Sequence, residues 1–284
     1  MGLKIKLARL LDRPGGRFLL GTIATSVAQR ASRCDVRIAY DHGRWTRRIG
    51  AQLVTDGPRF YYGYQDFQKW KEQAERYASE TRDYWLRFYE PKEGDTIIDV
   101  GAGQGEDTLT FSRAVGATGR VIAIEAHPLS FRALKNFCRL NSLSNVTPVH
   151  LALMDKPGEV HIAESEAWIE NRVVNGNGAS GMAVKAGTLD GLCLIAGITD
   201  IAFLKMNIEG AERYALLGAE LTMPRVRQIC VACHDFRANQ GHDEQFRTRA
   251  FVEEFLQSNG FRATSRLDDP RDYVRDHIFG LRPS

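Results

Sequence analysis

The sequence has little cysteine and no long apolar run, and each shortage excludes a class of protein. Its five cysteines among 284 residues are scattered and odd in number, unlike a disulfide framework, so we expect reduced thiols and a cytoplasmic protein. No segment reaches the roughly 20 apolar residues that a bilayer-spanning helix needs. A formal net charge of +3 is too small to indicate a nucleic-acid-binding surface, which usually needs a concentrated basic face.

Two of the cysteines, Cys230 and Cys233, have the C-x-x-C spacing of a zinc or redox pair. They lie within the apolar, strand-like run from Gln228, and no second pair accompanies them. We therefore interpret them as buried apolar side chains.

The remaining composition, 43% hydrophobic and 26% charged, is typical of a globular protein with one large core and an accessory segment. Residues 1–90 are predicted to form an N-terminal accessory segment with a basic amphipathic helix, short strands and an aromatic-rich helix over 65–89. Residues 91–284 are predicted to form the main domain. The aromatic residues of the accessory segment are expected to pack against that domain or to line a pocket for a substrate.

The accessory segment begins with four leucines, Leu3, Leu7, Leu10 and Leu11, on one face of the predicted helix, with basic residues on the other. Two interpretations remain open. The helix docks on its own protein, or residues 3–28 make a peripheral contact with a membrane.

From Pro91 onward, strand and helix patterns alternate, which predicts an α/β fold with parallel strands joined by crossover helices. Five buried strands are predicted over 96–100, 121–124, 145–153, 201–206 and 227–233. The intervening helices are predicted from 107, over 128–140 and 211–217, and a further helix over 248–258. Two extended pieces, 261–267 and 277–281, suit an antiparallel hairpin at the sheet edge. Residues 155–187 lack a helix pattern and suggest an inserted hairpin or loop that covers the site.

The first predicted strand leads into a glycine-rich turn, Asp99-Val-Gly-Ala-Gly-Gln-Gly105. Gly101, Ala102, Gly103 and Gly105 allow a ligand to approach backbone N–H groups at the start of the helix near Asp107. The spacing is G-x-G-x-G, whereas a dinucleotide fingerprint reads G-x-G-x-x-G. An acid at Asp99 suits an ammonium group better than a phosphate, so the turn favours S-adenosylmethionine.

A second acid, Glu125, ends the next predicted strand, where its carboxylate can accept hydrogen bonds from both ribose hydroxyls. NAD-binding domains use an acid similarly, and an NAD-dependent oxidoreductase stays an alternative that the glycine spacing opposes. Further predicted contacts with the cofactor are Ala126, His127, Leu153, Asp155 and Asn207.

The sequence from Asp95 to about Phe261 resembles the FkbM-type methyltransferases. The resemblance rests on Ile98–Ala102, Ile124–Pro128, Asn136, Asn141, Asn145-Val146, Thr188–Asp190 and, most specifically, Phe203–Glu212. It implies a class I methyltransferase (Rossmann-like) fold with a seven-stranded, mostly parallel sheet, and S-adenosyl-L-methionine as cofactor. It also implies O-methylation of a sugar, glycan or natural-product hydroxyl. Methylation of nucleic acid is disfavoured, because no Asn-Pro-Pro-aromatic motif is present.

One position departs from the family: many members have aspartate where this chain has Asn207, and a neutral amide cannot accept a proton. His234 is the candidate base, oriented by Glu209 or Asp235. Two other mechanisms remain open, a divalent metal held by Glu209, His234 and Asp235, or a structural histidine with transfer driven by proximity. A catalytically silent S-adenosylmethionine-binding scaffold is the alternative that Asn207 suggests.

Overall fold

A computed structural model describes residues 3–33, 35–41, 43–49, 52–55, 59–60, 67–162, 173–174 and 181–283. The chain divides into two compact units. Unit 1 comprises Met1–Glu80 with Asn136–Ser142, and unit 2 comprises Thr81–Lys135 with Leu143–Ser284. The division lies inside helix α3 (Phe67–Tyr84), earlier than the predicted boundary at residue 90. The end of α3 belongs to unit 2 because Thr81 Oγ1 donates a hydrogen bond to Asp107 Oδ1 at 2.6 Å.

Unit 1 packs helices on a small antiparallel sheet. Its elements are α1 (Leu3–Leu11), α2 (Arg17–Ser32), β1 (Val36–Asp41), β2 (Arg44–Ile49) and β3 (Gln52–Thr55), with strand order β1-β2-β3. The extended run predicted around residues 45–53 is thus divided between two strands. The buried core of the unit gathers Leu20, Ala24 and Ala28 of α2 against Val36, Ile38 and Trp45 of the sheet.

Unit 2 contains a seven-stranded sheet in the order β13-β14-β12-β11-β4-β5-β6. Strands β4, β5, β6, β11 and β12 are parallel, and β14 runs antiparallel to both β12 and β13. The strands are β4 (Thr96–Val100), β5 (Arg120–Glu125), β6 (Val146–His150), β11 (Ile201–Met206), β12 (Val226–Ala232), β13 (Arg262–Ser265) and β14 (His277–Leu281). The predicted parallel sheet with an antiparallel hairpin at its edge is confirmed.

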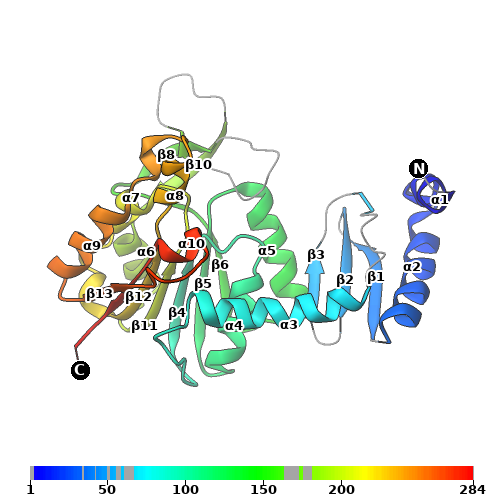
Figure 1. The fold of residues 1–284 in the computed structure, drawn as a ribbon, viewed down its shortest axis with the longest axis horizontal. Coiled ribbons are helices and arrows are strands. Elements are labelled where there is room, and N and C mark those ends of the chain that lie inside the picture. The colour runs from blue at the N-terminus through cyan, green and yellow to red at the C-terminus, as the bar shows by residue number, and fades with distance from the viewer. Residues whose placement is uncertain are drawn as a thin grey trace. The chain divides into compact units, whose positions relative to one another are not determined.

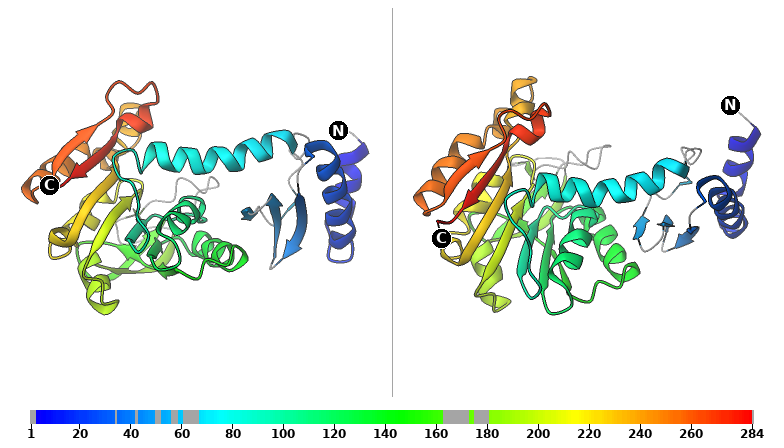
Figure 2. Two further views of the ribbon diagram at one scale, coloured as in Figure 1. Left: turned by 90° about the horizontal axis from the view of Figure 1, so that it is seen from below. Right: turned by 60° about the horizontal axis from the view of Figure 1, so that its bottom comes forward.

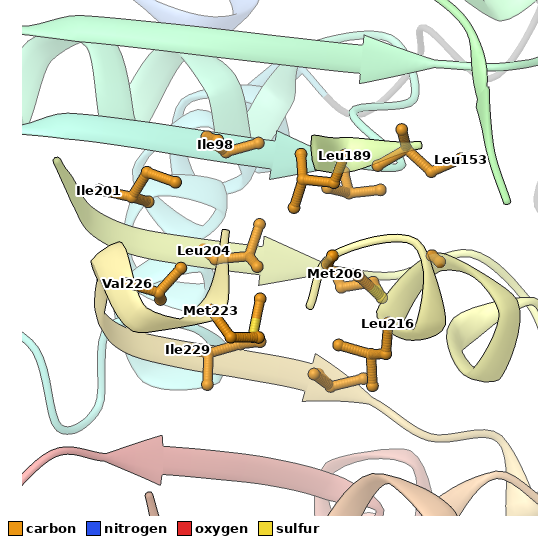
Figure 3. Close-up of a cluster of buried hydrophobic side chains, with 14 of the residues drawn as sticks. Ile98, Leu153, Leu189, Ile201, Leu204, Met206, Leu216, Met223, Val226 and Ile229 are labelled. Carbon is orange, nitrogen blue, oxygen red and sulfur yellow. The ribbon is translucent and has the colours of Figure 1, made fainter. Parts of the chain in front are cut away.

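Helices cover both faces of this sheet (Figures 1 and 2). On one face lie α6 (Leu189–Ile195), α7 (Glu212–Leu217) and α9 (Arg249–Ser258). Figure 3 shows the core on this face, where alternate strand residues such as Ile98, Leu204 and Ile229 meet Leu189 and Leu216. The helices that connect the first parallel strands are α4 (Glu106–Val115) and α5 (Pro128–Leu140); the remaining short ones are α8 (Asp235–Asn239) and α10 (Asp272–Arg275).

The opposite face of the sheet is rich in aromatic contacts from the segment that follows α3. The Trp85 ring stacks on His277 with centroids 4.5 Å apart, and Tyr89 stacks on Phe203 at 5.0 Å. The predicted packing of these aromatic residues on the main domain is confirmed. The side chains of Phe67 and Trp70 lie outside those that the structure describes.

The predicted strand over residues 145–153 is wrong as a single element. Its second half, β7 (Ala152–Leu153), pairs with β10 (Met182–Gly187) in a separate sheet of order β7-β10-β8-β9. Within that sheet β8 (Gly158–Ile162) and β10 are antiparallel, so an inserted hairpin is present as predicted, with β9 (Val173–Val174) at its edge. The glycine- and asparagine-rich part of the insertion, residues 175–180, lies outside the described residues.

The two cysteines with C-x-x-C spacing are both buried, as predicted. Cys230 Sγ lies 3.9 Å from the carbonyl oxygen of Tyr84, whereas Cys233 belongs to the core under α7 and α9. Residues three apart on a strand point to opposite faces, so the two thiols do not share a metal site. Burial raises the pKa of each thiol well above its ordinary value.

Candidate functional site

The glycine-rich turn lies at the carboxyl end of β4, where the backbone passes very close to the end of β11. Gly101 has φ +74°, and a Cβ atom there would lie 1.9 Å from the carbonyl oxygen of Asn207. No other residue type fits such an approach. Gly103 and Gly105 also have positive φ, and Gly105 is the N-cap of α4. The turn therefore exposes its backbone at the start of a helix, as the sequence predicts.

Asp99 and Lys205 form a buried ion pair beneath this turn. Lys205 Nζ donates to Asp99 Oδ1 and to the carbonyl oxygen of Gly101, each at 2.9 Å, and both side chains are fully buried. Burial alone would lower the pKa of Lys205, but the hydrogen bond to Asp99 and the negative charges of Asp99, Asp107 and Glu125 together outweigh burial and raise it. The second carboxylate oxygen of Asp99 accepts a 2.6 Å hydrogen bond from Thr108.

The structure thus corrects the role predicted for Asp99. Asp99 is fully buried in its pair with Lys205, and the residue does not line the cavity beside the turn. The carboxylates that do line it after the turn are Glu106 and Asp107, of which sequence reasoning named only Asp107. Burial raises the pKa of both groups. An acidic pair at the first positions of a helix was the sequence signal for Glu106.

Glu125 ends β5 and connects the glycine-rich turn with the residues that follow β5. Its Oε2 accepts a hydrogen bond from the Gly103 N–H and its Oε1 one from the His127 N–H, each at 2.8 Å. A carboxylate has about four lone-pair positions, so two remain for a ligand. Burial raises the pKa of Glu125.

A cavity of about 390 Å³ opens among these residues at the carboxyl ends of β4, β5 and β11. This is the position at which doubly wound sheets bind ligands. Its lining includes most of the predicted residues, namely Gly101, Ala102, Gly103, Asp107, Glu125, Ala126, His127, Leu153, Asn207 and Glu209. Glu106, Ser130, Leu151, Ile162 and Lys205 also line it. Of the predicted set, Asp99, Gly105, Asp155, His234 and Asp235 do not.

Four residues near the end of β11 form a second group, which we call the acid–histidine cluster: Glu209, Glu212, His234 and Arg237. His234 Nε2 lies 3.4 Å from Glu209 Oε1, and His234 Nδ1 lies 3.2 Å from Glu212 Oε1. Arg237 contacts the other oxygen of Glu209 at 3.3 Å. Two carboxylates and two cations are therefore matched in a largely buried group.

Within this cluster Glu209 has an unusual backbone conformation, with φ +55°. A left-handed conformation at a residue other than glycine costs of order 1 kcal/mol, and the surrounding turn must impose it. Here Glu212 imposes it, because Glu212 Oε1 accepts from the N–H groups of Ile208 and Gly210 at 3.3 and 3.2 Å. The Glu209 side chain consequently borders the cavity and is 14% exposed.

The protonation of His234 follows from this arrangement. Burial alone would lower the pKa of His234, but the charge of Glu212 and the contacts with Glu209 outweigh burial and raise it to about 10. Burial alone would raise the pKa of Glu212, but His234 and the backbone N–H groups that Glu212 accepts together outweigh burial and lower it. His234 is therefore an imidazolium at neutral pH and has no free nitrogen to accept a proton, which opposes the base role predicted for it.

Asp235 is directed away from the cavity. Its Oδ2 accepts the N–H groups of Thr248 and Arg249 at the start of α9, both at 3.0 Å. The metal set envisaged from the sequence, Glu209 with His234 and Asp235, is therefore not assembled. Within the described residues, no three His, Cys, Asp or Glu side chains have the arrangement of a metal site.

The raised pKa of His234 predicts a pH-dependent stability. Between pH 6.5 and about 10 the folded protein keeps a proton that the unfolded chain releases, so this contribution is complete below pH 6.5 and is lost toward pH 10. We expect the free energy of unfolding to fall with a slope of up to ~1.4 kcal/mol per pH unit in this window. Urea unfolding of the wild type and His234→Gln at several pH values measures it. Parallel curves for the two proteins would contradict the prediction.

Comparisons with known proteins agree with this geometry. A family model described as the methyltransferase FkbM domain matches residues 99–263. A tRNA (adenine(58)-N(1))-methyltransferase catalytic subunit from Yarrowia lipolytica is 31% identical over 67 residues, which are 24% of this chain and 17% of that protein. The chain thus spans only a small part of this curated relative.

Two solved structures are similar at low sequence identity. A methyltransferase FkbM from Methylobacillus flagellatus KT is 15% identical, with TM-score 0.47, over 77% of this chain and 59% of that one. A fibrillarin from Aeropyrum pernix with natively bound S-adenosyl-L-methionine is 14% identical, with TM-score 0.44, over 87% of this chain and all of that one.

The strand order with a single antiparallel strand, and the glycine turn after β4, define a class I methyltransferase fold. The family match extends over more than half of the chain, from the turn to β13. This chain belongs to the FkbM methyltransferase family.

Proposed function

We propose that the protein transfers a methyl group from S-adenosylmethionine to a hydroxyl of a small molecule or glycan. The observation that carries the proposal is the position of Glu125, which ends β5 and hydrogen-bonds the glycine turn while bordering the cavity. A carboxylate there can accept hydrogen bonds from ribose hydroxyls. The glycine spacing of the turn also differs from the G-x-G-x-x-G spacing that binds the phosphates of a dinucleotide.

The charge of the cavity supports the same cofactor. Glu106, Asp107 and Glu125 contribute three carboxylates to its lining, against the single ammonium of Lys205, and the fourth carboxylate, Glu209, is paired with His234 and Arg237. A ligand with a net positive charge, such as S-adenosylmethionine, suits this lining better than a dinucleotide with two phosphates. Glu125 would hold the ribose, Glu106 and Asp107 the ammonium group, and Leu151 and Leu153 the adenine.

When bound, S-adenosylmethionine supplies an electrophilic methyl group on its sulfonium sulfur. We assign to Glu209 the role of proton acceptor, which the protonated His234 cannot take. Its carboxylate would orient the acceptor hydroxyl and accept the hydroxyl proton as the oxygen is methylated. His234 and Arg237 position that carboxylate through their contacts at 3.4 and 3.3 Å.

Calorimetric titration tests the cofactor assignment. We expect S-adenosylmethionine to bind and NAD not to bind. Glu125 accepts hydrogen bonds from the N–H groups of Gly103 and His127. In Glu125→Gln the amide –NH2 cannot accept, so one of these two N–H groups loses its partner, and the affinity for S-adenosylmethionine should fall about 10- to 100-fold. Glu159→Gln, at an exposed position of β8, is the matched control and should bind as the wild type does. Binding of NAD, or equal affinity in Glu125→Gln, would contradict the proposal.

A second candidate is an S-adenosylmethionine-binding scaffold without turnover. Asn207 and the protonated His234 favour it, since neither side chain can accept a proton. Release of S-adenosylhomocysteine with a panel of methyl hexosides as acceptors separates the two. Binding of the cofactor without turnover of any acceptor in that panel would favour the scaffold.

A further inference from the structure

Helix α2 of unit 1 carries large apolar side chains beyond those that pack inside the unit. The inner face, with Leu20, Ala24 and Ala28, packs on β1 and β2. Outside that face the helix exposes four large apolar side chains, and Phe18 is 88% exposed. The four are Phe18, Leu19, Ile23 and Val27. Leu19, Ile23 and Val27 recur every four residues and therefore share one side of the helix, next to the packed face.

Helix α1 continues the pattern. Ala8 and Leu11 pack against the core of unit 1, while Leu7 and Leu10 are 53% and 60% exposed. We call the exposed set the apolar stripe: Leu7, Leu10, Phe18, Leu19, Ile23 and Val27. Exposed apolar groups of this size, flanked by charged residues, mark interaction surfaces.

The charge around the stripe indicates what covers it. Residues 1–33 contain seven Lys and Arg side chains and one acid, Asp12, a net charge of +6. The whole chain carries +3, so the other 251 residues carry −3. Lys6, Arg9 and Arg13 are exposed beside the stripe. Basic residues next to an apolar helix face are typical of segments that lie in the interface of an anionic membrane.

A groove of about 750 Å³ runs beside the stripe, between α2 and β1. Phe18 borders it, and its lining includes Arg17, Arg37 and Arg48 together with Asp35, which contacts Arg48 at 3.2 Å. Guanidinium groups are donors that suit phosphate oxygens. The groove therefore places guanidinium groups, which bind anions, next to apolar side chains. This combination suits a phospholipid, which has a phosphate headgroup beside acyl chains.

We propose that unit 1 docks peripherally on a bilayer that contains anionic lipid, through the apolar stripe and its flanking basic residues. A second copy of the chain fits less well, because a two-fold contact through this face would oppose two surfaces of charge +6. Docking is peripheral, since no helix among the described residues is long and apolar enough to cross a bilayer.

Sedimentation of the full chain with vesicles tests the proposal. We expect binding to phosphatidylcholine vesicles with 30% phosphatidylglycerol, at least tenfold weaker binding to pure phosphatidylcholine, and loss of binding in ~0.5 M salt. In Leu19→Gln/Ile23→Gln the apparent affinity for anionic vesicles should fall at least tenfold. The matched control is Leu194→Gln/Ile195→Gln, which changes two exposed apolar residues of unit 2 and should bind as the wild type does.

Three outcomes would overturn the proposal. The wild type does not sediment with anionic vesicles, or the stripe variant binds as tightly as the wild type. In the third, the wild type dimerises without lipid and the stripe variant does not, which would assign the stripe to contact between copies. Circular dichroism and S-adenosylmethionine titration of both variants verify that folding and unit 2 are unchanged.

Discussion

Glu209→Gln should reduce turnover about 10²- to 10⁴-fold while leaving the affinity for S-adenosylmethionine within about threefold of the wild type. The amide keeps the size of Glu209 and its contact with Arg237, but it cannot accept the hydroxyl proton. The effect should therefore appear in kcat. Release of S-adenosylhomocysteine, with an acceptor found in the hexoside panel, measures it.

The matched control is Glu220→Gln, at an exposed position after α7, which should have wild-type kcat. The His234→Gln variant distinguishes the two proton acceptors. If His234 were the base, its variant would lose turnover and Glu209→Gln would retain more than a tenth of the wild-type kcat. We expect instead that His234→Gln loses less than Glu209→Gln, because His234 acts by positioning Glu209.

Lys205→Ala should lower the free energy of unfolding by about 3–5 kcal/mol, because it leaves the Asp99 carboxylate buried without its cation. The variant also removes the ammonium that donates to the Gly101 carbonyl oxygen, so the turn loses a support. Guanidinium-induced unfolding measures the loss. Lys156→Ala, at an exposed position, is the control and should change stability by no more than ~0.5 kcal/mol.

A double variant keeps this prediction testable if Lys205→Ala does not fold. Asp99→Asn/Lys205→Met removes both charges and fills the space of the lysine stem. It should recover much of the stability that the single variant loses. If Lys205→Ala unfolds at the same denaturant concentration as Lys156→Ala, the buried ion pair contributes nothing measurable, contrary to expectation.

Much of the fold of unit 2 was predictable because the relevant signals are local. The bounds of β4, α5, β11 and β14 are those predicted, since apolar runs of strand length and the 3.6-residue period identify each element within a short window. The split of 145–153 into β6 and β7 was not predictable, because it depends on pairing with β10, which lies about 30 residues further on.

Some residues of the candidate site were predictable from local sequence and others were not. The glycine turn and Glu125 could be predicted from the sequence, because a turn between strand and helix and an acid at a strand end are local features. The role of Asp99 could not, since its partner Lys205 lies on another strand, 106 residues away in sequence. Asp235 was misassigned for a related reason: its carboxylate accepts the N–H groups at the start of α9.

The sequence by itself determined the strand and helix pattern, the glycine turn whose close contact with Asn207 only glycine permits, and membership of one methyltransferase family. Tertiary structure alone decided which ionisable groups are charged and which face the cavity. Burial and charged neighbours set a pKa, and both arise only when distant segments meet. The pKa of His234 is raised because folding brings it between Glu209 and Glu212, and of these two carboxylates Glu209 lines the cavity.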